Sequence, residues 1–535
     1  MADPATQLMN SGDTAWVMMC TVLVFIMCPG LGFFYAGLAR AKNALSLMYL
    51  TVLAVAVVSF QWYLIGYSLT FSETGGPFIG DTAHFLLRGV GIAPHVTAQT
   101  IPAGCFMIFQ MMFACLTPAL AFGSAAERMS LGPAIVFLFV WSTLVYDVIT
   151  YWVWAGNGWL ATLGVMDFAG GTPVHISSGL AAVAYAMVVG KRRDYDENAN
   201  TPHNVSFVFL GLAMMWFGWF GFNAGSALAA NARSVQSLIG THLSGCVAAI
   251  VWVLMDYRLT KKWSMIGLCT GAVAGLATIT PGSGFVSSSS ALAFGAIGAI
   301  VCNLAVQYKH KYHFDDALDV FAVHYIGGLV GLVLTGIFAQ QKVIALSYNE
   351  GDTVPLGGWL DGNFIQVPIQ LAAIVTVSVW SFVVTYIILV VINKIPFLRL
   401  RLNDEAEMMG VDWSEMGERA YAYLPMTESG EFITPNGNST SADVAQGVVV
   451  KRVPDIIEQP AEAGGDLGGI KLQDMDLAST PSYFQLEGNR NNDRSASPSP
   501  TIRTDSTRKG SSGINDGASS STYSSRKQQK ARAID

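Results

Sequence analysis

Charged residues are scarce in this chain of 535 residues. Asp, Glu, Lys and Arg make up 13 % of the sequence and hydrophobic residues 52 %, whereas a soluble domain usually carries about 25 % charged residues. Windows such as 44–71 and 129–146 contain no charged residue at all. Since a helix that crosses a bilayer needs about 20 apolar residues, the lack of charge argues against a water-soluble fold and predicts a membrane protein.

Cysteine is also scarce, and there is no excess of basic residues. The seven cysteines lie in or beside apolar segments, where cysteine usually behaves as a small hydrophobic residue, so we expect no essential disulfide. The formal net charge is −7, and acidic residues gather toward the C-terminus. Nothing in this pattern indicates binding to nucleic acid.

Apolar segments separated by short breaks predict an all-α, polytopic membrane protein of about eleven transmembrane helices. The segments are residues 16–38, 47–71, 104–124, 132–154, 171–190, 204–230, 240–256, 263–282, 288–307, 318–340 and 365–393. If the N-terminus lies outside, the inner loops collect fourteen Lys and Arg residues, whereas the outer loops hold only Arg88, Arg233 and Lys342. This bias predicts that the N-terminus is outside and the C-terminus inside.

The two halves of the chain share weak internal similarity. The fifth and tenth segments each carry an aspartate, a histidine and a Gly-Gly pair: Asp167 and His175 in one, Asp319 and His324 in the other. Because each half contains five segments, the second copy would be inverted, which is a common transporter architecture. We therefore predict inverted repeats of helices 1–5 and 6–10, followed by an additional eleventh helix.

His175 and His324 are the strongest candidates for function. Ionisable side chains inside membrane spans cost free energy and normally face a cavity, a partner or a pathway. A membrane histidine can also simply bridge two helices by hydrogen bonds, but two at related positions of inverted halves favour a shared pore element. We expect the pair to be neutral or to share one proton, and a metal site is less favoured because no third ligand is evident.

Asp167 and several aromatic residues are weaker candidates. Asp167 precedes a Gly-Gly pair and a proline, so its carboxylate can cap the start of a helix, or its charge can favour a cation at the outer mouth, and the two roles are compatible. Phe113 follows another aromatic, Trp154 ends the fourth segment, and Phe222 lies among small residues. Such aromatic faces attract cations, although each ring alone is also compatible with packing.

Three blocks of this sequence resemble the Amt/Mep/Rh family of ammonium transporters. They are residues 167–176, 219–226 and 319–324, and the resemblance spans about residues 12–424. It looks similar to fungal Mep-type permeases, particularly the high-affinity subgroup that also senses nutrients. It implies a homotrimer with a pore in each subunit, acting on ammonium or ammonia in the plasma membrane.

The resemblance also implies an outer ammonium site. Trp154, Phe113 and Ser226 would form it, with Asp167 nearby. The segment between Trp154 and Asp167 is one residue longer than in bacterial members, so the neighbouring Trp152 or Trp159 is an alternative to Trp154.

Below that site, the resemblance implies a gate and a pore. Phe113 and Phe222 would stack to form the gate, and His175 with His324 would form the pore pair. The two histidines could relay a proton between imidazole nitrogens while neutral NH₃ crosses the apolar passage.

The cytoplasmic tail carries a further family motif. It comprises Glu407, Gly410 and Asp412 within a predicted regulatory region, residues 396–430, that follows the transporter domain at residues 16–395. Residues 1–15 would form an extracellular N-terminus.

A Ser-rich extension, residues 431–535, ends the chain and has the composition of a disordered segment. Ser497-Pro498 and Ser499-Pro500 are candidate phosphorylation sites for a cytoplasmic kinase.

Three classes of function compete for this sequence. Transport of ammonium is the leading prediction, and an ammonium receptor that signals through the tail, with or without transport, is the alternative. An enzyme fits least, because no activated nucleophile, metal cluster or phosphate-binding loop accompanies the histidines. We expect no cofactor.

Overall fold

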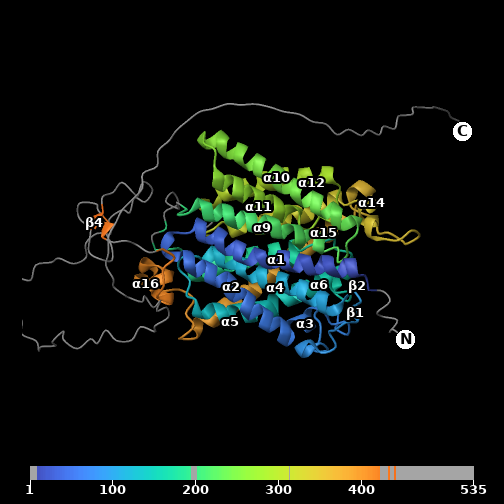
Figure 1. The fold of residues 1–535 in the computed structure, drawn as a ribbon, viewed down its shortest axis with the longest axis horizontal. Coiled ribbons are helices and arrows are strands. Elements are labelled where there is room, and N and C mark those ends of the chain that lie inside the picture. The colour runs from blue at the N-terminus through green and yellow to red at the C-terminus, as the bar shows by residue number, and fades with distance from the viewer. Residues whose placement is uncertain are drawn as a thin grey trace, which may run out of the picture. The chain divides into compact units, whose positions relative to one another are not determined.

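Most of the computed structural model is a bundle of long helices. It describes residues 9–193, 195, 202–311, 314–421, 432–433 and 439–440. In Figure 1 the labelled long helices of residues 9–421 run roughly side by side along one direction. The longer helices are α1 (Ser11–Leu38), α2 (Ala44–Gln61), α4 (Ala103–Ala125), α5 (Gly132–Trp141), α8 (Ser177–Val189), α9 (Val205–Gly225), α10 (Ala232–Thr260), α11 (Met265–Ile279), α12 (Ser288–Gln307), α13 (Ile326–Phe338) and α15 (Gln366–Lys394).

Short elements extend or connect these helices. The short α-helices are α3 (Tyr67–Phe71), α6 (Asp147–Trp154), α7 (Trp159–Leu163), α14 (Gln341–Ile344) and α16 (Asp404–Met409). Five π-helical turns are η3 (Trp62–Gly66), η5 (Ser142–Tyr146), η6 (Gly171–Ile176), η8 (Phe321–Tyr325) and η11 (Asp412–Met416), and five 3₁₀ turns are Ala41–Asn43, Phe85–Leu87, Lys309–Lys311, Ala345–Ser347 and Trp359–Asp361. Strands β1 (Pro94–His95) and β2 (Ala98–Pro102) pair antiparallel, as do β3 (Phe432–Ile433) and β4 (Ser439–Thr440).

The helices are long and apolar enough to span a bilayer. Within the described residues, ten helical stretches meet this condition, and α11, with 15 residues, is apolar but shorter. These eleven elements match the eleven predicted segments one for one. The prediction of an all-α polytopic membrane protein is confirmed, while the exact number of crossings and their orientation stay predictions.

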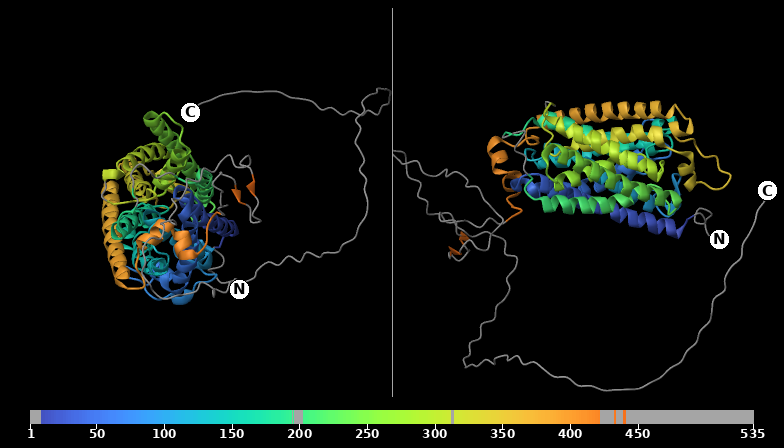
Figure 2. Two further views of the ribbon diagram at one scale, coloured as in Figure 1. Left: turned by 90° about the vertical axis from the view of Figure 1, so that its left-hand side faces the viewer. Right: turned by 90° about the horizontal axis from the view of Figure 1, so that it is seen from above.

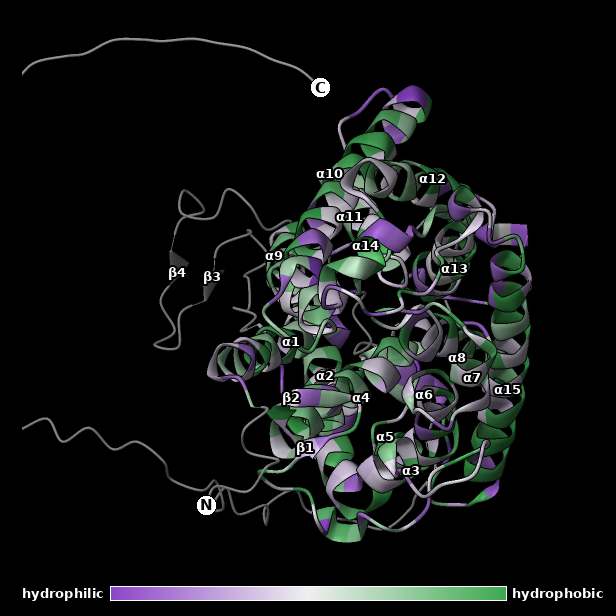
Figure 3. Ribbon diagram, turned by 90° about the vertical axis from the view of Figure 1, so that its right-hand side faces the viewer, coloured by the Kyte–Doolittle hydropathy of each residue, from purple (hydrophilic) through white to green (hydrophobic). Residues whose placement is uncertain are grey.

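The outer surface of the bundle is apolar where a bilayer would touch it. Helix α15 runs along one side of the bundle in both views of Figure 2 and is almost uniformly hydrophobic in Figure 3. Its Leu371, Val375 and Val379 are about half exposed and recur every four residues. Its other face is buried, and there the Ser381 hydroxyl donates to the carbonyl of Ser177 at 2.6 Å. A water-soluble protein would place polar residues on the exposed stripe.

The first helices of the two predicted repeats, α1 and α9, pack closely. A Cβ atom at Gly37 would lie 2.6 Å from the carbonyl oxygen of Asn204 and from the backbone nitrogen of Val208. Small residues allow such close approach of helices in membranes, where water does not drive helices together.

The fifth and tenth segments meet in a reciprocal contact. Gly179 lies four residues after His175, and a Cβ there would stand 2.5 Å from the backbone nitrogen of Tyr325, next to His324. Gly328 lies four residues after His324, and a Cβ there would stand 3.0 Å from the Cβ of His175. This symmetric exchange of contacts is what a two-fold relation between inverted repeats predicts.

The two ends of the bundle differ. Strands β1 and β2 and helix α14 lie at one end, here called the Trp154 end because α6 finishes there, and α16 lies at the other, here called the tail end. Helix α1 begins at the Trp154 end, where the backbone nitrogen of Asn10 donates to Thr100 at 2.8 Å. Which end faces the outside of a cell stays a prediction.

Candidate functional site

Two phenylalanines stack across the bundle between α4 and α9. The rings of Phe113 and Phe222 are 4.1 Å apart at an angle of 29°, and both side chains are fully buried. Phe113 comes from the middle of α4 and Phe222 from the last turn of α9. The structure therefore brings together the two residues that the resemblance assigns to a gate.

Trp154 lies against the phenylalanine stack, on the side where β1, β2 and α14 lie. Its ring meets Phe113 edge-on at 5.8 Å and 85°, and its indole nitrogen donates to the backbone carbonyl of Asp167 at 2.9 Å. The alternatives Trp152 and Trp159 contact each other instead, with ring centroids 5.9 Å apart. The geometry therefore places Trp154 next to Phe113.

Ser226 follows the stack by one turn of α9. It caps the end of that helix, is half-buried, and its hydroxyl donates to the carbonyl of Phe222 at 2.9 Å. The oxygen lone pairs of the hydroxyl can still accept a hydrogen bond. The C-terminal end of a helix also carries partial negative charge, which favours a nearby cation.

The carboxylate of Asp167 caps the segment that carries His175. It accepts hydrogen bonds from the backbone nitrogens of Gly170 at 2.9 Å, Gly171 at 2.7 Å and Thr172 at 2.6 Å, and from the Thr172 hydroxyl at 2.6 Å. Gly170 adopts φ of +114°, which favours glycine. Burial raises the pKa of this carboxyl group, and the hydrogen bonds oppose that shift. The predicted capping role is therefore present in the geometry, and the Asp167 backbone also holds Trp154.

The two histidines form a pair below the phenylalanine stack. Nδ1 of His175 lies 3.2 Å from Nδ1 of His324, the rings are nearly parallel at 21°, and both side chains are almost fully buried. They sit on the π-helical turns η6 and η8, which are frequent at functional sites. Because a hydrogen bond needs one donor and one acceptor, the two Nδ1 atoms share a single proton.

Trp219 was missed by the sequence reasoning. Its ring stacks on His175 at 5.7 Å and 23°, and its indole nitrogen donates to the Thr280 hydroxyl at 3.0 Å. It lies three residues before Phe222, so the two share one face of α9. That spacing is the signal by which it could have been found.

A small cavity continues the column toward the tail end. It has a volume of about 60 Å³, and His324, Tyr35, Val323 and Asp319 are among the residues that line it. The order along the bundle is therefore Trp154, the phenylalanine stack, the histidine pair and this cavity.

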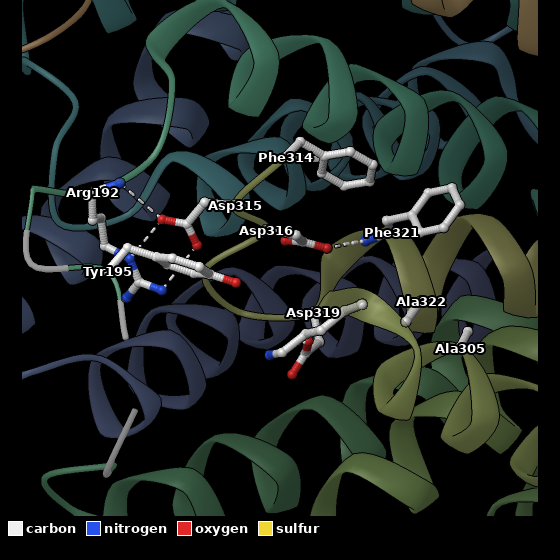
Figure 4. A pocket seen from close by; sticks show the side chains of 10 residues that line it. Arg192, Tyr195, Ala305, Phe314, Asp315, Asp316, Asp319, Phe321 and Ala322 are labelled. Atoms are coloured by element: carbon white, nitrogen blue, oxygen red, sulfur yellow. Dashed lines mark hydrogen bonds and ion pairs between the residues drawn. The ribbon is translucent and has the colours of Figure 1, made fainter. Parts of the chain in front are cut away.

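Aspartates anchor the start of the helix that carries His324. Asp316 accepts from the backbone nitrogen of Phe321 at 2.7 Å, and Asp319, with φ of +60°, pairs with Lys309 at 2.7 Å. Figure 4 shows these aspartates in a neighbouring pocket. Burial and the charge of Asp319 raise the pKa of Asp316 to about 7.

A buried ion network lies beside that pocket. Arg192 donates to Asp315 at 2.8 Å and to Glu127 at 2.9 Å, and Glu127 also accepts from Arg40 at 2.7 Å. Burial favours the neutral form of Glu127, but the hydrogen bond from Arg40 and the charge of Arg192 lower the pKa of its carboxyl group. From the sequence, these arginines are predicted to be inner-loop charges, and their acidic partners are not identified.

The tail motif docks onto the tail end of the bundle. Glu407 is 1 % exposed and accepts from the backbone nitrogen of Arg193 at 2.8 Å and from the Arg401 guanidinium at 2.8 Å. Asp412 accepts from the backbone nitrogens of Leu45 at 2.9 Å and Ser46 at 2.8 Å. These two nitrogens belong to the first turn of α2, so Asp412 caps a membrane helix.

Gly410 allows the close approach of this motif. It has φ of +105°, and a Cβ there would stand 2.6 Å from the carbonyl oxygen of Lys42. The ammonium group of Lys42 donates to the carbonyl of Met408 at 2.6 Å. Glu407, Gly410 and Asp412 thus lie against the loop between α1 and α2, whereas Ser497 and Ser499 lie outside the described residues.

Comparisons with known proteins identify the family of this chain. Residues 15–421 match the model of the Ammonium Transporter Family. The chain is 49 % identical over 431 residues to Ammonium transporter 1 of Schizosaccharomyces pombe, covering 81 % of this chain and 86 % of that protein. It is 42 % identical over 424 residues to Ammonium transporter MEP2 of Saccharomyces cerevisiae, covering 77 % and 85 %.

Solved structures give the same result. The crystal structure of Candida albicans Mep2 matches with a TM-score of 0.71 and 42 % identity, covering 75 % of this chain and 89 % of that one. A structure described as a Sensor Amt Protein matches with a TM-score of 0.68 and 29 % identity, covering 76 % and 98 %. The resemblance inferred from three sequence motifs is confirmed: the chain belongs to the ammonium transporter family.

Proposed function

We propose that this protein carries ammonium across a membrane along the column of Trp154, Phe113, Phe222, His175 and His324. The observation that carries the proposal is the stack of two phenylalanines directly before a hydrogen-bonded pair of buried histidines. The phenylalanine rings and the histidines lie next to each other, since the ring centroids of Phe222 and His175 are 6.3 Å apart. Transport fits this arrangement better than catalysis does.

Ammonium would first bind at the Trp154 end. The ring faces of Trp154 and Phe113 offer cation–π attraction, and the Ser226 hydroxyl offers a hydrogen-bond acceptor. Potassium ions gain less there, because they cannot donate hydrogen bonds. Asp167 would support this site indirectly, through its backbone bond to Trp154.

Deprotonation would be the selective step. An intact ion that passes Phe113 and Phe222 must leave water for a low-dielectric passage, which is costly, whereas neutral NH₃ crosses cheaply. The proton would move between His175 and His324 through their shared hydrogen bond. The movements of NH₃ and of the proton are then coupled, although the two follow separate routes.

The tail would regulate this movement. Glu407 and Asp412 attach the tail to loops and helices of the bundle, and phosphorylation of Ser497 or Ser499 by a cytoplasmic kinase would add about −1.5 to −2 charges each. The added charge would be repelled by the acidic tail motif or attracted to arginines such as Arg193. We further propose a homotrimer in the plasma membrane with the Trp154 end outside and the tail end in the cytoplasm.

A receptor that binds ammonium and signals through its tail is the second candidate. The docked tail motif favours it, because a change at the bundle could be passed to the tail through Asp412 at the start of α2. Similarity to the structure described as a Sensor Amt Protein is compatible with such a role.

Flux measurements on the purified full-length protein in liposomes separate these candidates. An ammonium gradient should change internal pH and ammonium content and should generate a current. A pure receptor would leave all three unchanged. Removal of residues 431–535 should preserve folding and leave some flux, and complete loss of surface expression would contradict a purely regulatory extension.

A further inference from the structure

A second group of buried polar side chains lies away from the column. It occupies the place where η3 and α3 face η5 and α6. Nine of the twenty buried side-chain atoms without a hydrogen-bond partner in the described part of the chain belong to these elements and to the last residue of α2. This set, here called the Asp147 cluster, comprises Gln61, Trp62, Tyr67, Thr70, Ser142, Tyr146, Asp147, Thr150 and Tyr151.

Asp147 and Gln61 are the centre of the cluster. The Gln61 amide nitrogen donates to one carboxyl oxygen of Asp147 at 2.7 Å and to the Thr143 hydroxyl at 3.0 Å. The other carboxyl oxygen of Asp147 and the amide oxygen of Gln61 have no hydrogen-bond partner within 3.5 Å. The Thr70 hydroxyl is a more distant hydrogen-bond partner of the Asp147 carboxyl group, and the Thr150 hydroxyl is one of Tyr146. The ion pairs of the described residues supply no cation for Asp147.

Such a group is costly inside a membrane. A buried polar atom without a partner destabilises the fold, and an unpaired carboxylate in a span is more costly still. Both Asp147 and Gln61 are 0 % exposed. Buried groups of this kind in other proteins are usually satisfied by ordered water, which makes two to four hydrogen bonds. The concentration of so many in one place therefore calls for a ligand.

We propose that the Asp147 cluster is a binding site for water and for one exchangeable proton, separate from the histidine pore. Ordered water bridges the oxygens of Asp147 and Gln61 to the surrounding hydroxyl groups, and Asp147 carries the proton. Hydronium at the site gives its proton to the carboxylate and leaves as water, and the reverse step returns it.

The cluster lies next to a polar loop at the Trp154 end. Tyr151 lies one helical turn beyond Asp147, and its hydroxyl is 2.7 Å from the position of a Cβ on Gly75. Gly75 belongs to the polar loop after α3, in which Asp81 accepts a hydrogen bond from Thr74 at 2.7 Å. Polar groups thus continue from this loop to Asp147.

The opposite direction is closed. Helix α5, which precedes the cluster toward the tail end, has the apolar sequence Gly-Pro-Ala-Ile-Val-Phe-Leu-Phe-Val-Trp. The site therefore takes up and releases water and protons from one end and does not form a second pore.

Helix α4 separates the cluster from the pore. Phe113 and Cys115 are two residues apart, so they point in nearly opposite directions from the helix axis, about 200° apart. Phe113 faces Phe222, whereas Cys115 faces Ser59 of α2 at 3.4 Å and lies beside Tyr146. A proton on Asp147 is therefore not part of the His175–His324 pair.

Radiolytic labelling with hydroxyl radicals tests for water, because radicals made from bound water oxidise side chains that bulk solvent cannot reach. Trp62 and Trp141 are a matched pair, since both are 0 % exposed. The indole nitrogen of Trp141 donates to the Thr385 hydroxyl at 2.8 Å, whereas that of Trp62 has no partner. In the full-length protein in lipid nanodiscs, Trp62 should be oxidised several-fold faster than Trp141. Equal, slow oxidation of the two would overturn the proposal.

Infrared spectroscopy tests for the proton. The full-length protein should show a carboxylic-acid carbonyl band that shifts on transfer to D₂O and disappears in Asp147→Asn. The control Asp256→Asn, which changes a half-buried acid bonded to Asn303, should keep the band. Asp147→Asn should retain ammonium flux, which shows that it folds. Absence of any Asp147-dependent band, or a band that does not exchange with D₂O, would also overturn the proposal.

Discussion

The centre of the bundle and its tail end solve the problem of polar groups near a membrane in opposite ways. In the centre, His175 and His324 hold one shared hydrogen bond between their two rings and are flanked by aromatic faces. At the tail end, Arg192, Glu127 and Asp315 are just as buried but are fully charged and fully paired. The histidines proposed to exchange a proton therefore have an incomplete set of hydrogen-bond partners, whereas the structural charges have a complete one.

Replacing both histidines of the central pair should have the strongest effect. In His175→Leu with His324→Leu, no group remains to carry the proton that ammonium gives up, so the ammonium-induced current in proteoliposomes should fall below about a tenth of the wild-type value. The protein should still elute as a folded species, because leucine suits an apolar passage. The control His242→Leu, an exposed histidine on α10, should keep the current.

Full current with unchanged rejection of K⁺ in the double histidine variant would refute the proton relay. Current carried by K⁺ in this variant would show that the histidines also contribute to selectivity. An intact ion would then cross the apolar passage that only NH₃ is expected to cross.

Removing a cation from the buried ion network should have the second strongest effect. Arg192→Met removes a cation that binds both Glu127 and Asp315, and an uncompensated buried charge typically costs about 3–5 kcal/mol. The midpoint of thermal unfolding in detergent should fall clearly. The control Arg258→Met, an exposed residue at the end of α10, should leave it within error, and an unchanged midpoint in Arg192→Met would show that the network is not structural.

The difference between the two regions also decides what the sequence could predict. The histidine pair could be predicted, because an ionisable residue in an apolar segment stands out and two occur at related positions. The partners of Arg192 could not, since they come from loops 65 and 123 residues away in the chain. A cluster of arginines after a span indicates topology but does not show which acid each one binds.

The same limit applies to the cap at Asp412. The sequence shows an acidic motif after the last span, but the two backbone nitrogens that Asp412 caps lie more than 360 residues earlier. Asp167 was easier, because the Gly-Gly pair that it caps follows within five residues. Local hydrogen bonds can be predicted from spacing, whereas contacts between the ends of a chain depend on the whole fold.

A smaller effect should follow from loosening the tail. Asp412→Ala removes the cap of α2, which typically costs about 0.5–2 kcal/mol, and Gly410→Ala brings a methyl group against Lys42 at a strained φ. In both variants limited proteolysis should cut the tail faster while the bundle stays folded. Flux should change but the rejection of K⁺ should not, because residues 404–416 of the tail dock at the tail end of the bundle, away from Phe113 and Phe222. Altered K⁺ rejection would contradict a purely regulatory tail.

The smallest effect concerns His95, which unlike the central pair has a backbone hydrogen-bond partner at each ring nitrogen. Its Nδ1 accepts from the backbone nitrogen of Thr97 at 3.1 Å, so its Nε2 carries the proton and donates to the carbonyl of Phe71 at 3.0 Å. Its ring stacks on Phe106 at 4.8 Å, ahead of Phe113 on α4. Burial lowers the pKa of His95, and the bond to Phe71 and the charge of Glu73 only partly oppose this shift.

Because the folded pKa lies below the unfolded value of about 6.5, the folded loop binds protons less readily than the unfolded loop does. The contribution of neutral His95 to the stability of the folded loop is therefore fully present above about pH 6.5 and is lost as the pH falls toward the folded pKa. Between about pH 7.5 and about pH 5, the hydrogen-exchange protection factor of the Thr97 amide should fall by up to about tenfold. His95→Gln should remove this pH dependence and the control His84→Gln should keep it. A protection factor that does not change with pH in the wild type would show that His95 stays neutral throughout this range. Its hydrogen-bond partners would then fix its protonation state as firmly as the ion network fixes the charge of Arg192.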